Sequence, residues 1–358
     1  MRADQSVMPD TLIDVKPSRN ISIELLRILC CLLVVAIHVA PMHDAYLKLD
    51  VSDFEKHESL IIQSIVRMGL PVFFIISGIF ILNDNKKNDI GGFYRKRLTG
   101  LLIPFFVFSA IHYIVAGIGV NGNDIYSLIQ GYAVGLLSKT GIAVHFWFVY
   151  VILGIYLVSP AFSVMYSGIS ERGAVIVFLI LVLSKAYNIY FSWLIPGIEI
   201  PNIPTWLTYF LLGGLIPRLP SLSSKWLLLL FSLSFSLTCI MTYVQFSGSI
   251  KLYLAPFDSG VNMILQSTAC CMFFYSLRLV VRERIEKGVC FIASLSYGVY
   301  LIHFLVLIEI GRFLDASWYL HSPVLYTLIV TLMVFVISMI ISAVVNKLIV
   351  NRLVNYIA

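Results

Sequence analysis

The first long apolar stretch of the chain, ISIELLRILCCLLVVAIHVAP (residues 21–41), carries three ionisable side chains. It is long enough to cross a bilayer, which takes about 20 helical residues. An ionisable group in hydrocarbon costs roughly 2.5 to 3.5 kcal/mol, so Glu24, Arg27 and His38 each need a partner, an aqueous cavity or a function. At 3.6 residues per turn they share one helix face, with Arg27 and His38 about 16 Å apart along the axis. This pattern predicts a helix that faces a polar interior rather than lipid.

Composition extends the membrane assignment to the whole chain. It is 59% hydrophobic and only 12% charged, with a mean hydropathy of +0.92, whereas a soluble domain is about one quarter charged. We predict an all-α integral membrane protein, a bundle of about ten transmembrane helices. The expected spans cover residues 21–41, 60–82, 98–119, 145–163, 173–190, 205–216, 226–246, 260–280, 290–311 and 323–345. Residues 1–20 are expected to form a cytoplasmic tail, and residues 21–358 one multi-spanning membrane domain.

Lysine and arginine are concentrated in the loops on one side of the expected bundle, most strongly in NDNKKNDIGGFYRKR (residues 83–97). Basic loops stay in the cytoplasm. Both termini are therefore predicted to be cytoplasmic, in a multi-pass protein of the cell inner membrane. Arg27 then lies toward the cytoplasm and His38 toward the outer face. The net charge of +6 is explained by these loops, and no nucleic-acid partner is expected.

Several segments between and within the spans have a local signature. Residues 42–58 are expected to form a charged loop, and IYSLIQGYAVGLL (residues 125–137) is too short to span comfortably, so it lies at the interface or re-enters. Pro71 and Ser77-Gly78 indicate a kink or a close helix contact in the second span. The six cysteines lie in apolar segments without CxxC spacing, which favours buried thiols over disulfides or metal ligands. No metal site is expected.

Polar side chains gather at both ends of the predicted spans. Near the outer ends they are His38, Arg67, His145, Lys185, His303 and Glu309. Each alone is compatible with a satisfied interior residue, but together they suggest an outward-facing polar cavity. On the cytoplasmic side, Arg95, Lys96 and Arg97 are either membrane anchors or an anion site. The chain has no P-loop, GxGxxG, HExxH or GxSxG motif.

Five segments, in order, resemble the membrane-bound acyltransferase family 3. They are RNISIELLRILCCLLVVAIHVA with its Glu24, Arg27 and His38, LPVFFIISGIFIL, FYRKRLTGLLIPF, HFWFVYVILGIYLVSP and SLSYGVYLIHFLVL. The resemblance spans about residues 20 to 345. One departure is Gly100, which stands where the family often has a second arginine after Arg97.

The resemblance implies an O-acyltransferase that moves an acyl group, usually acetyl from acetyl-CoA, to a sugar hydroxyl of an envelope glycan or lipid-linked precursor. No permanently bound cofactor is expected. His38 would act as the base or as a transient acyl carrier, with Arg27 held by Glu24. Arg95, Lys96 and Arg97 would bind the donor phosphates with Arg27. The acceptor-side cavity would comprise Arg67, His145, Trp147, Tyr300 and His303.

Of two other functions considered, a transporter is also compatible with a polar cavity, and a scaffold or receptor is poorly supported. A transporter or flippase of a polar envelope precursor more often has paired broken helices, and a membrane scaffold or receptor would leave the intramembrane charges without a purpose. For the enzyme, two arrangements stay open. Either donor and acceptor enter from opposite faces, or both meet on the cytoplasmic side and the outer histidines are structural.

Overall fold

The structure, a computed structural model, describes residues 20–84, 89–117, 124–193, 197–247, 253–314 and 316–357, which contain helices and no β-strand. The first half comprises α1 (Ile21–Val39), α2 (His43–Tyr46), α3 (Asp53–Val66), α4 (Gly69–Leu82), α5 (Ile90–Gly117), α6 (Ile125–Leu137), η1 (Val144–Phe146), α7 (Trp147–Ser167), α8 (Glu171–Ala186) and η2 (Tyr187–Phe191). The second half comprises α9 (Thr205–Leu215), η3 (Ile216–Arg218), α10 (Ser224–Phe246), α11 (Val261–Ser276), α12 (Glu283–Gly311), α13 (Ala316–His321), α14 (Pro323–Val345), η4 (Asn346–Val350) and α15 (Asn351–Ile357).

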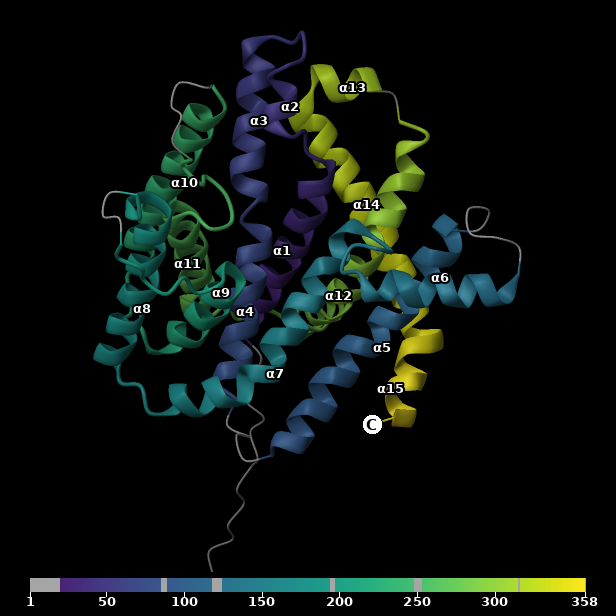
Figure 1. Cartoon of the computed structure of the whole chain (residues 1–358), viewed down its shortest axis with the longest axis horizontal. Coiled ribbons are helices and arrows are strands. Elements are labelled where there is room, and N and C mark those ends of the chain that lie inside the picture. The colour runs from purple at the N-terminus through teal and green to yellow at the C-terminus, as the bar shows by residue number, and fades with distance from the viewer. Residues whose placement is uncertain are drawn as a thin grey trace, which may run out of the picture.

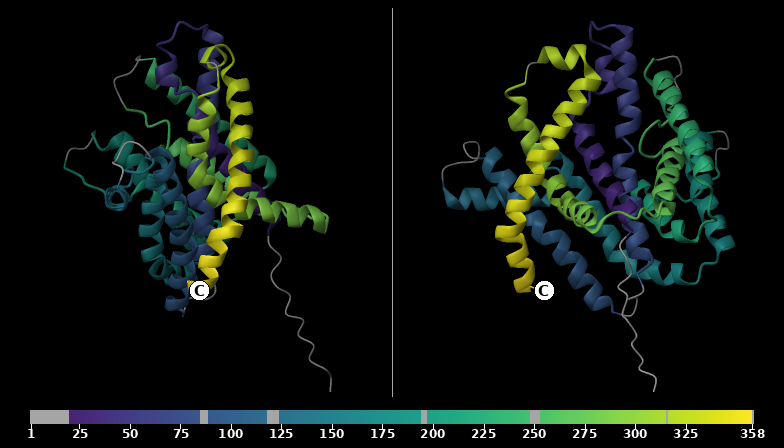
Figure 2. Two further views of the ribbon diagram at one scale, coloured as in Figure 1. Left: turned by 90° about the vertical axis from the view of Figure 1, so that its right-hand side faces the viewer. Right: turned by 180° about the vertical axis from the view of Figure 1, so that it is seen from behind.

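The long helices lie side by side in a bundle (Figure 1). Eight helical stretches in the described part of the chain are long and apolar enough to cross a membrane, so the all-α membrane fold is confirmed. The expected spans over residues 205–216 and 260–280 form shorter helices, α9 with 11 residues and α11 with 16. Helix α1 lies inside the bundle, where α4, α11, α12 and α14 pack around it (Figures 1 and 2).

Helices α4 and α9 approach each other through glycines. A Cβ atom added to Gly78 would lie 1.9 Å from the carbonyl oxygen of Phe210, and one added to Gly213 would lie 2.1 Å from that of Ile75. Small residues allow the backbones of two membrane helices to touch in this way. The close helix contact expected at Ser77-Gly78 is therefore confirmed.

The second predicted span is broken into α3 and α4, which are separated at Arg67 and Met68. Pro71 has no N–H to bond the carbonyl of Arg67, four residues earlier, so an unbroken helix would lose a hydrogen bond there. The break leaves the Arg67 side chain at a junction between two helices.

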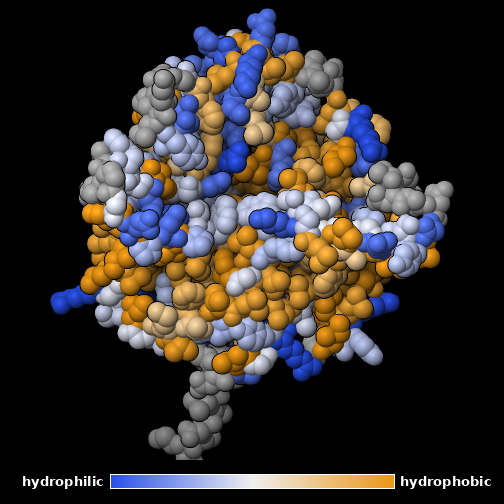
Figure 3. Space-filling view, viewed as in Figure 1, coloured by the Kyte–Doolittle hydropathy of each residue, from blue (hydrophilic) through white to orange (hydrophobic). Residues whose placement is uncertain are grey.

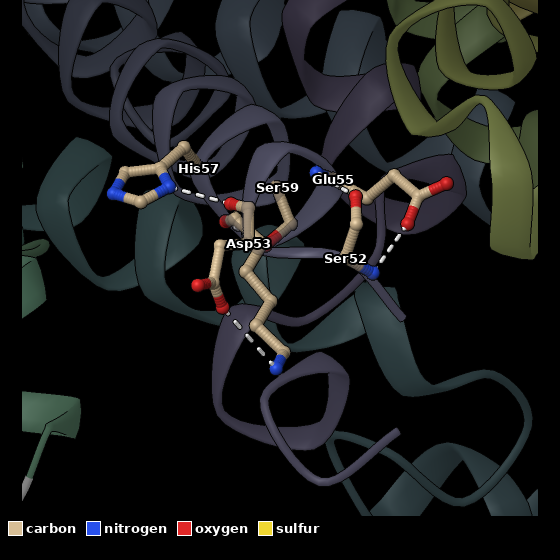
Figure 4. A network of polar contacts seen from close by, with 6 residues as sticks. Ser52, Asp53, Glu55, His57 and Ser59 are labelled. Atoms are coloured by element: carbon tan, nitrogen blue, oxygen red, sulfur yellow. Dashed lines mark hydrogen bonds and ion pairs between the residues drawn. The ribbon is translucent and has the colours of Figure 1, made fainter. Parts of the chain in front are cut away.

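Helix α3 also begins earlier than the sequence analysis placed it, so the prediction of a charged loop as far as residue 58 was wrong. A capping box starts α3: the Ser52 hydroxyl accepts from Glu55 N at 3.4 Å, and the Glu55 carboxylate accepts from Ser52 N at 2.7 Å (Figure 4). This pair satisfies two backbone donors that a helix start leaves free. Behind it, His57 Nδ1 lies 2.5 Å from the carbonyl oxygen of Asp53.

The start of α5 and the C-terminal end of α15 lie at the same end of the bundle (Figure 1). Arg95 Nη2 donates to the carbonyl oxygen of Ile357 at 3.2 Å, which joins the two helices. Residues 1–19 of the expected cytoplasmic tail lie outside the described residues, and the cytoplasmic side of the bundle stays a prediction.

Helix α6 extends away from the bundle (Figures 1 and 2) and has no buried residue among those described. Its exposed apolar side chains include Ile125, Ile129 and Leu137. An amphipathic or apolar helix too short to span is suited to the membrane interface. A broad hydrophobic band crosses the lower half of the same face of the molecule, with hydrophilic residues gathered above it (Figure 3).

All six cysteines are free thiols, four of them buried.

Candidate functional site

The Arg27 side chain lines a cavity of about 400 Å³ near the start of α1. Its Nη1 atom lies 2.9 Å from Glu24 Oε2, which is the ion pair expected from their spacing. The Arg27 guanidinium also lies over the ring of Phe80, 5.4 Å from its centroid. The carboxylate orients the guanidinium and leaves its outer edge on the cavity.

The first turns of α5 add two more cations to this cavity, Lys96 and Arg97. Arg97 Nη2 lies 3.7 Å from a carboxylate oxygen of Asp84. Arg95 is separated from them: it lines an adjoining cavity of about 240 Å³, which shares Lys96 and Gly100 with the first. No atom lies within 4 Å of a Cβ added to Gly100. The glycine that departs from the family pattern therefore leaves open space between the two cavities.

Four histidines from four separate elements meet near the other end of α1. They are His38 (α1), His112 (α5), His145 (η1) and His303 (α12). The ring centroid of His38 lies 5.2 Å from that of His303 and 6.3 Å from that of His145. The His145 centroid lies 4.9 Å from that of His303 and 5.5 Å from that of His112. We call this set the histidine cluster.

Backbone carbonyls fix the tautomers of three members of the cluster. The carbonyl oxygen of Leu301 accepts from His112 Nε2 at 2.8 Å and from His145 Nε2 at 3.3 Å. The carbonyl of Tyr300 accepts from His303 Nδ1 at 2.6 Å. Because a carbonyl only accepts, these nitrogens carry the protons. In the neutral rings, His145 Nδ1 and His303 Nε2 are then lone-pair acceptors, and both are buried without a hydrogen-bond partner among the described residues.

His38 differs from the other three histidines. It is half-buried, whereas His112, His145 and His303 are almost fully buried. Its ring contacts those of Phe304, His145 and His303, but no hydrogen bond holds its nitrogens to another described residue. His38 is thus the most exposed member of the cluster.

A small apolar gap, which we call the neck, adjoins the basic cavity and contains Tyr300, whose ring also contacts the histidine cluster. It is a gap of about 20 Å³ lined by Val34, Leu70, Phe73, Phe148, Tyr297 and Tyr300. Phe73, Phe148 and Tyr297 also line the basic cavity. At the other end, the Tyr300 hydroxyl donates to the carbonyl of His145, and its ring lies 5.8 Å from that of His303. Val34 is the α1 residue in its lining, and it lies between Arg27 and His38 in the chain.

The remaining residues predicted for the acceptor side are distributed around this cluster. His145 and His303 belong to it, and the Tyr300 ring contacts both of them. The Trp147 ring packs against that of Trp206 at a tilt of 37°, with 5.2 Å between ring centroids. Arg67 lines a separate pocket of about 440 Å³.

Two residues that the sequence grouped with the cavity have other partners. Lys185 donates to Asn202 Oδ1 at 3.1 Å and to Thr205 Oγ1 at 3.3 Å. Glu309 pairs with Arg312 at 2.8 Å near the end of α12. Both are satisfied structural groups here.

His112 was missed by the sequence analysis. It carried the same signal as the other histidines, an imidazole within an apolar span, but it belongs to none of the segments that resemble the family. Its role in holding the Leu301 carbonyl depends on contact between α5 and α12. Among the described residues, no group of histidine, cysteine or carboxylate side chains has an arrangement that could hold a metal ion.

Comparison with known proteins gives one family and two relatives. The family described as "Acyltransferase domain" matches residues 20–343. The putative membrane-bound acyltransferase YfiQ of Bacillus subtilis (strain 168) is 22% identical over 295 residues, which cover 78% of each chain. A serine/alanine racemase of Enterococcus gallinarum is 26% identical over 137 residues, 36% of this chain but only 18% of the racemase. No solved structure matches at a comparable level.

Proposed function

Because the chain belongs to the acyltransferase family that matches residues 20–343, we propose that it is a membrane O-acyltransferase acting on envelope glycans. The donor is a cytoplasmic acyl-CoA, most simply acetyl-CoA, and the acceptor is a hydroxyl of a cell-envelope polysaccharide or a lipid-linked sugar. The reaction takes place at His38, in the inner membrane.

The observation that carries this proposal is the neck, which adjoins the basic cavity and whose Tyr300 contacts the histidine cluster. Arg27, Lys96 and Arg97 suit the phosphates of a coenzyme A. The apolar lining of the neck suits the arm that carries the thioester. The distance of about 16 Å between Arg27 and His38 along α1 is comparable to that arm in its extended form.

The proposed chemistry uses His38 as a general base. Its neutral imidazole takes the proton of the acceptor hydroxyl while the oxygen attacks the thioester carbonyl. The C–S bond breaks, and the imidazolium returns the proton to the departing thiolate of coenzyme A. In the covalent variant, the imidazole nitrogen attacks the thioester first, and the C–S bond breaks to release coenzyme A as its thiolate. The acceptor oxygen then attacks the acyl carbon, the N–C bond to histidine breaks, and the hydroxyl proton passes to the thiolate. Both routes need His38, and they differ in whether an acyl-histidine forms without acceptor.

The transporter alternative is less well supported, because a transporter has no need for a base next to a cavity suited to phosphates. A flippase would move its cargo without changing the acyl content of the glycan. Ester-linked acyl groups on the envelope glycan, measured by proton NMR with and without the protein, separate the two functions.

The test uses a strain that lacks the gene and is complemented with variants. The wild-type protein restores glycan acyl esters, and His38→Ala reduces them at least about 100-fold, since a positioned acid–base group contributes roughly 10² to 10⁴ in rate. His57→Ala is the matched control, because His57 is exposed on α3 (Figure 4). His38→Ala removes a polar group from the span and inserts normally. Near wild-type acylation by His38→Ala would rule out both roles of this residue.

A further inference from the structure

The pocket that contains Arg67 has no role in the chemistry described so far. It lies where the break between α3 and α4 meets the start of α9 and the segment between α10 and α11. Its volume of about 440 Å³ is within the range of roughly 300 to 1,000 Å³ that is typical of small-molecule sites. We call it the Arg67–Asp258 pocket. Besides these two residues, its lining includes Trp206, Gln245, Tyr253 and Phe257.

Residues 253–259, the described part of the segment after α10, form one wall of the pocket and are held by hydrogen bonds. The Asn262 side chain donates to the carbonyl of Pro256 at 2.8 Å, and the Tyr209 hydroxyl donates to the carbonyl of Asp258. Leu254 N donates to Gln245 Oε1 at 2.6 Å. Ala255 and Asp258 have positive φ angles of 47° and 48°. Strained backbone of this kind persists where the surroundings fix it, and it is concentrated at binding sites.

The two charged groups of the lining have free hydrogen-bonding capacity. Arg67 uses Nε to donate to Gln63 Oε1 at 3.1 Å and lies over Phe257, 5.1 Å from the ring centroid. Its two terminal nitrogens have no hydrogen bond within the described structure. The Asp258 carboxylate likewise has no hydrogen bond or ion pair with another described residue. Burial raises the pKa of the Asp258 carboxyl, and the nearby charge of Arg67 opposes that shift.

This combination suits a sugar ring. Aromatic walls accept the apolar C–H faces of a pyranose, while a guanidinium donates to hydroxyl oxygens and a carboxylate accepts from hydroxyl hydrogens. One cation and one anion in the lining offer no net charge to a charged ligand. Lys185 lies behind Thr205 and is already bonded there. The lining therefore favours an uncharged ligand over a phosphate or a uronic acid.

The pocket is also connected with the reaction centre. Trp206 packs on Trp147, two residues after His145 in the chain. We propose that the Arg67–Asp258 pocket binds the acyl acceptor through an uncharged sugar unit with adjacent free hydroxyls. This proposal rests on the function proposed above, and it adds the site and the class of acceptor.

The experiment uses the full chain in lipid nanodiscs, with saturation-transfer NMR of methyl glycosides of glucose, galactose and mannose, and of glucuronate. At least one neutral glycoside should bind the wild type, at least tenfold more tightly than glucuronate. Asp258→Asn should weaken that binding at least tenfold. Asparagine matches aspartate in shape and tolerates a positive φ, so the fold is retained. Tyr253→Leu, which truncates an exposed wall, should also weaken binding.

Asp50→Asn, on an exposed loop, is the matched control and should bind as the wild type does. The proposal is overturned if no neutral glycoside binds, if glucuronate binds equally well, or if Asp258→Asn leaves binding unchanged. Coenzyme A binding is measured on the same samples. A wild type that binds glycoside through Asp258 but does not bind coenzyme A would contradict the proposed donor and leave the pocket assignment intact.

Discussion

The Arg27 guanidinium is held in a fixed position and presents one edge to the basic cavity. The ion pair to Glu24 and the contact with Phe80 hold its guanidinium at the cavity wall. Arg27→Lys keeps the charge but loses the planar fork that binds phosphate through two parallel hydrogen bonds. We expect the affinity for coenzyme A to fall about tenfold, equivalent to about 1.4 kcal/mol, with acceptor binding unchanged. Isothermal titration of the purified protein measures both, and Arg172→Lys, exposed on α8, is the control. If coenzyme A affinity were unchanged and acceptor binding were weakened, the cavity at Arg27 would be the acceptor site and not the donor site.

At the residue scale, the sequence predicted the relations between residues on one helix. It missed the sites that residues from several helices form together. The pairing of Arg27 with Glu24 followed from a spacing of three residues. The shared face of Arg27 and His38 followed from helical periodicity. By contrast, Arg95 was grouped with Arg97 although it faces an adjoining cavity. Asp258 could not be selected, because its importance depends on its placement opposite Arg67, which no local pattern encodes.

At the scale of elements, the crossing of α4 and α9 gives a direct test of packing. Gly78→Ala adds a Cβ that would lie 1.9 Å from a backbone oxygen of α9, so the helices must move apart. Gly154→Ala, in α7, meets no atom within 4 Å and should be neutral or stabilising by up to about 1 kcal/mol, since alanine favours helix over glycine. We expect a clearly lower melting temperature for Gly78→Ala and no decrease for Gly154→Ala, measured by thermal unfolding in detergent. Equal melting temperatures would contradict the close contact.

Helix existence was predictable from apolar runs, but helix boundaries depended on capping and on proline. All ten expected spans correspond to helices, because hydrophobic length is a strong signal. The start of α3 was missed although Ser52 and Glu55 form a capping box, because the charges of this segment were taken to indicate a loop. The break at Arg67 has a local cause in Pro71. Its consequence, an arginine at a pocket, depends on α9 and on the segment after α10.

For the whole molecule, the decisive prediction is its orientation. Two introduced cysteines report from which side of the membrane each end of the site is accessible. Thr99→Cys lies in the lining of the cavity that contains Arg95. Val144→Cys is next to His145 in the chain. In a background without the six native cysteines, an impermeant maleimide should label Thr99→Cys from the cytoplasmic side, with protection by coenzyme A. It should label Val144→Cys from the opposite side. Labelling of Val144→Cys only from the cytoplasm would place both substrates on one side of the membrane.

The most direct test of the account is acyl transfer across a sealed membrane. Inverted vesicles from the producing cell expose the cytoplasmic face and enclose the glycan-bearing face. Radiolabelled acetyl-CoA is added outside, and label in the glycan is measured before and after treatment with an added esterase protein, which cannot cross the membrane. We predict that label enters the enclosed glycan, resists the esterase until detergent is added, and is absent with His38→Ala. Label that the esterase removes without detergent, or that forms equally with His38→Ala, would contradict transfer through the neck to His38.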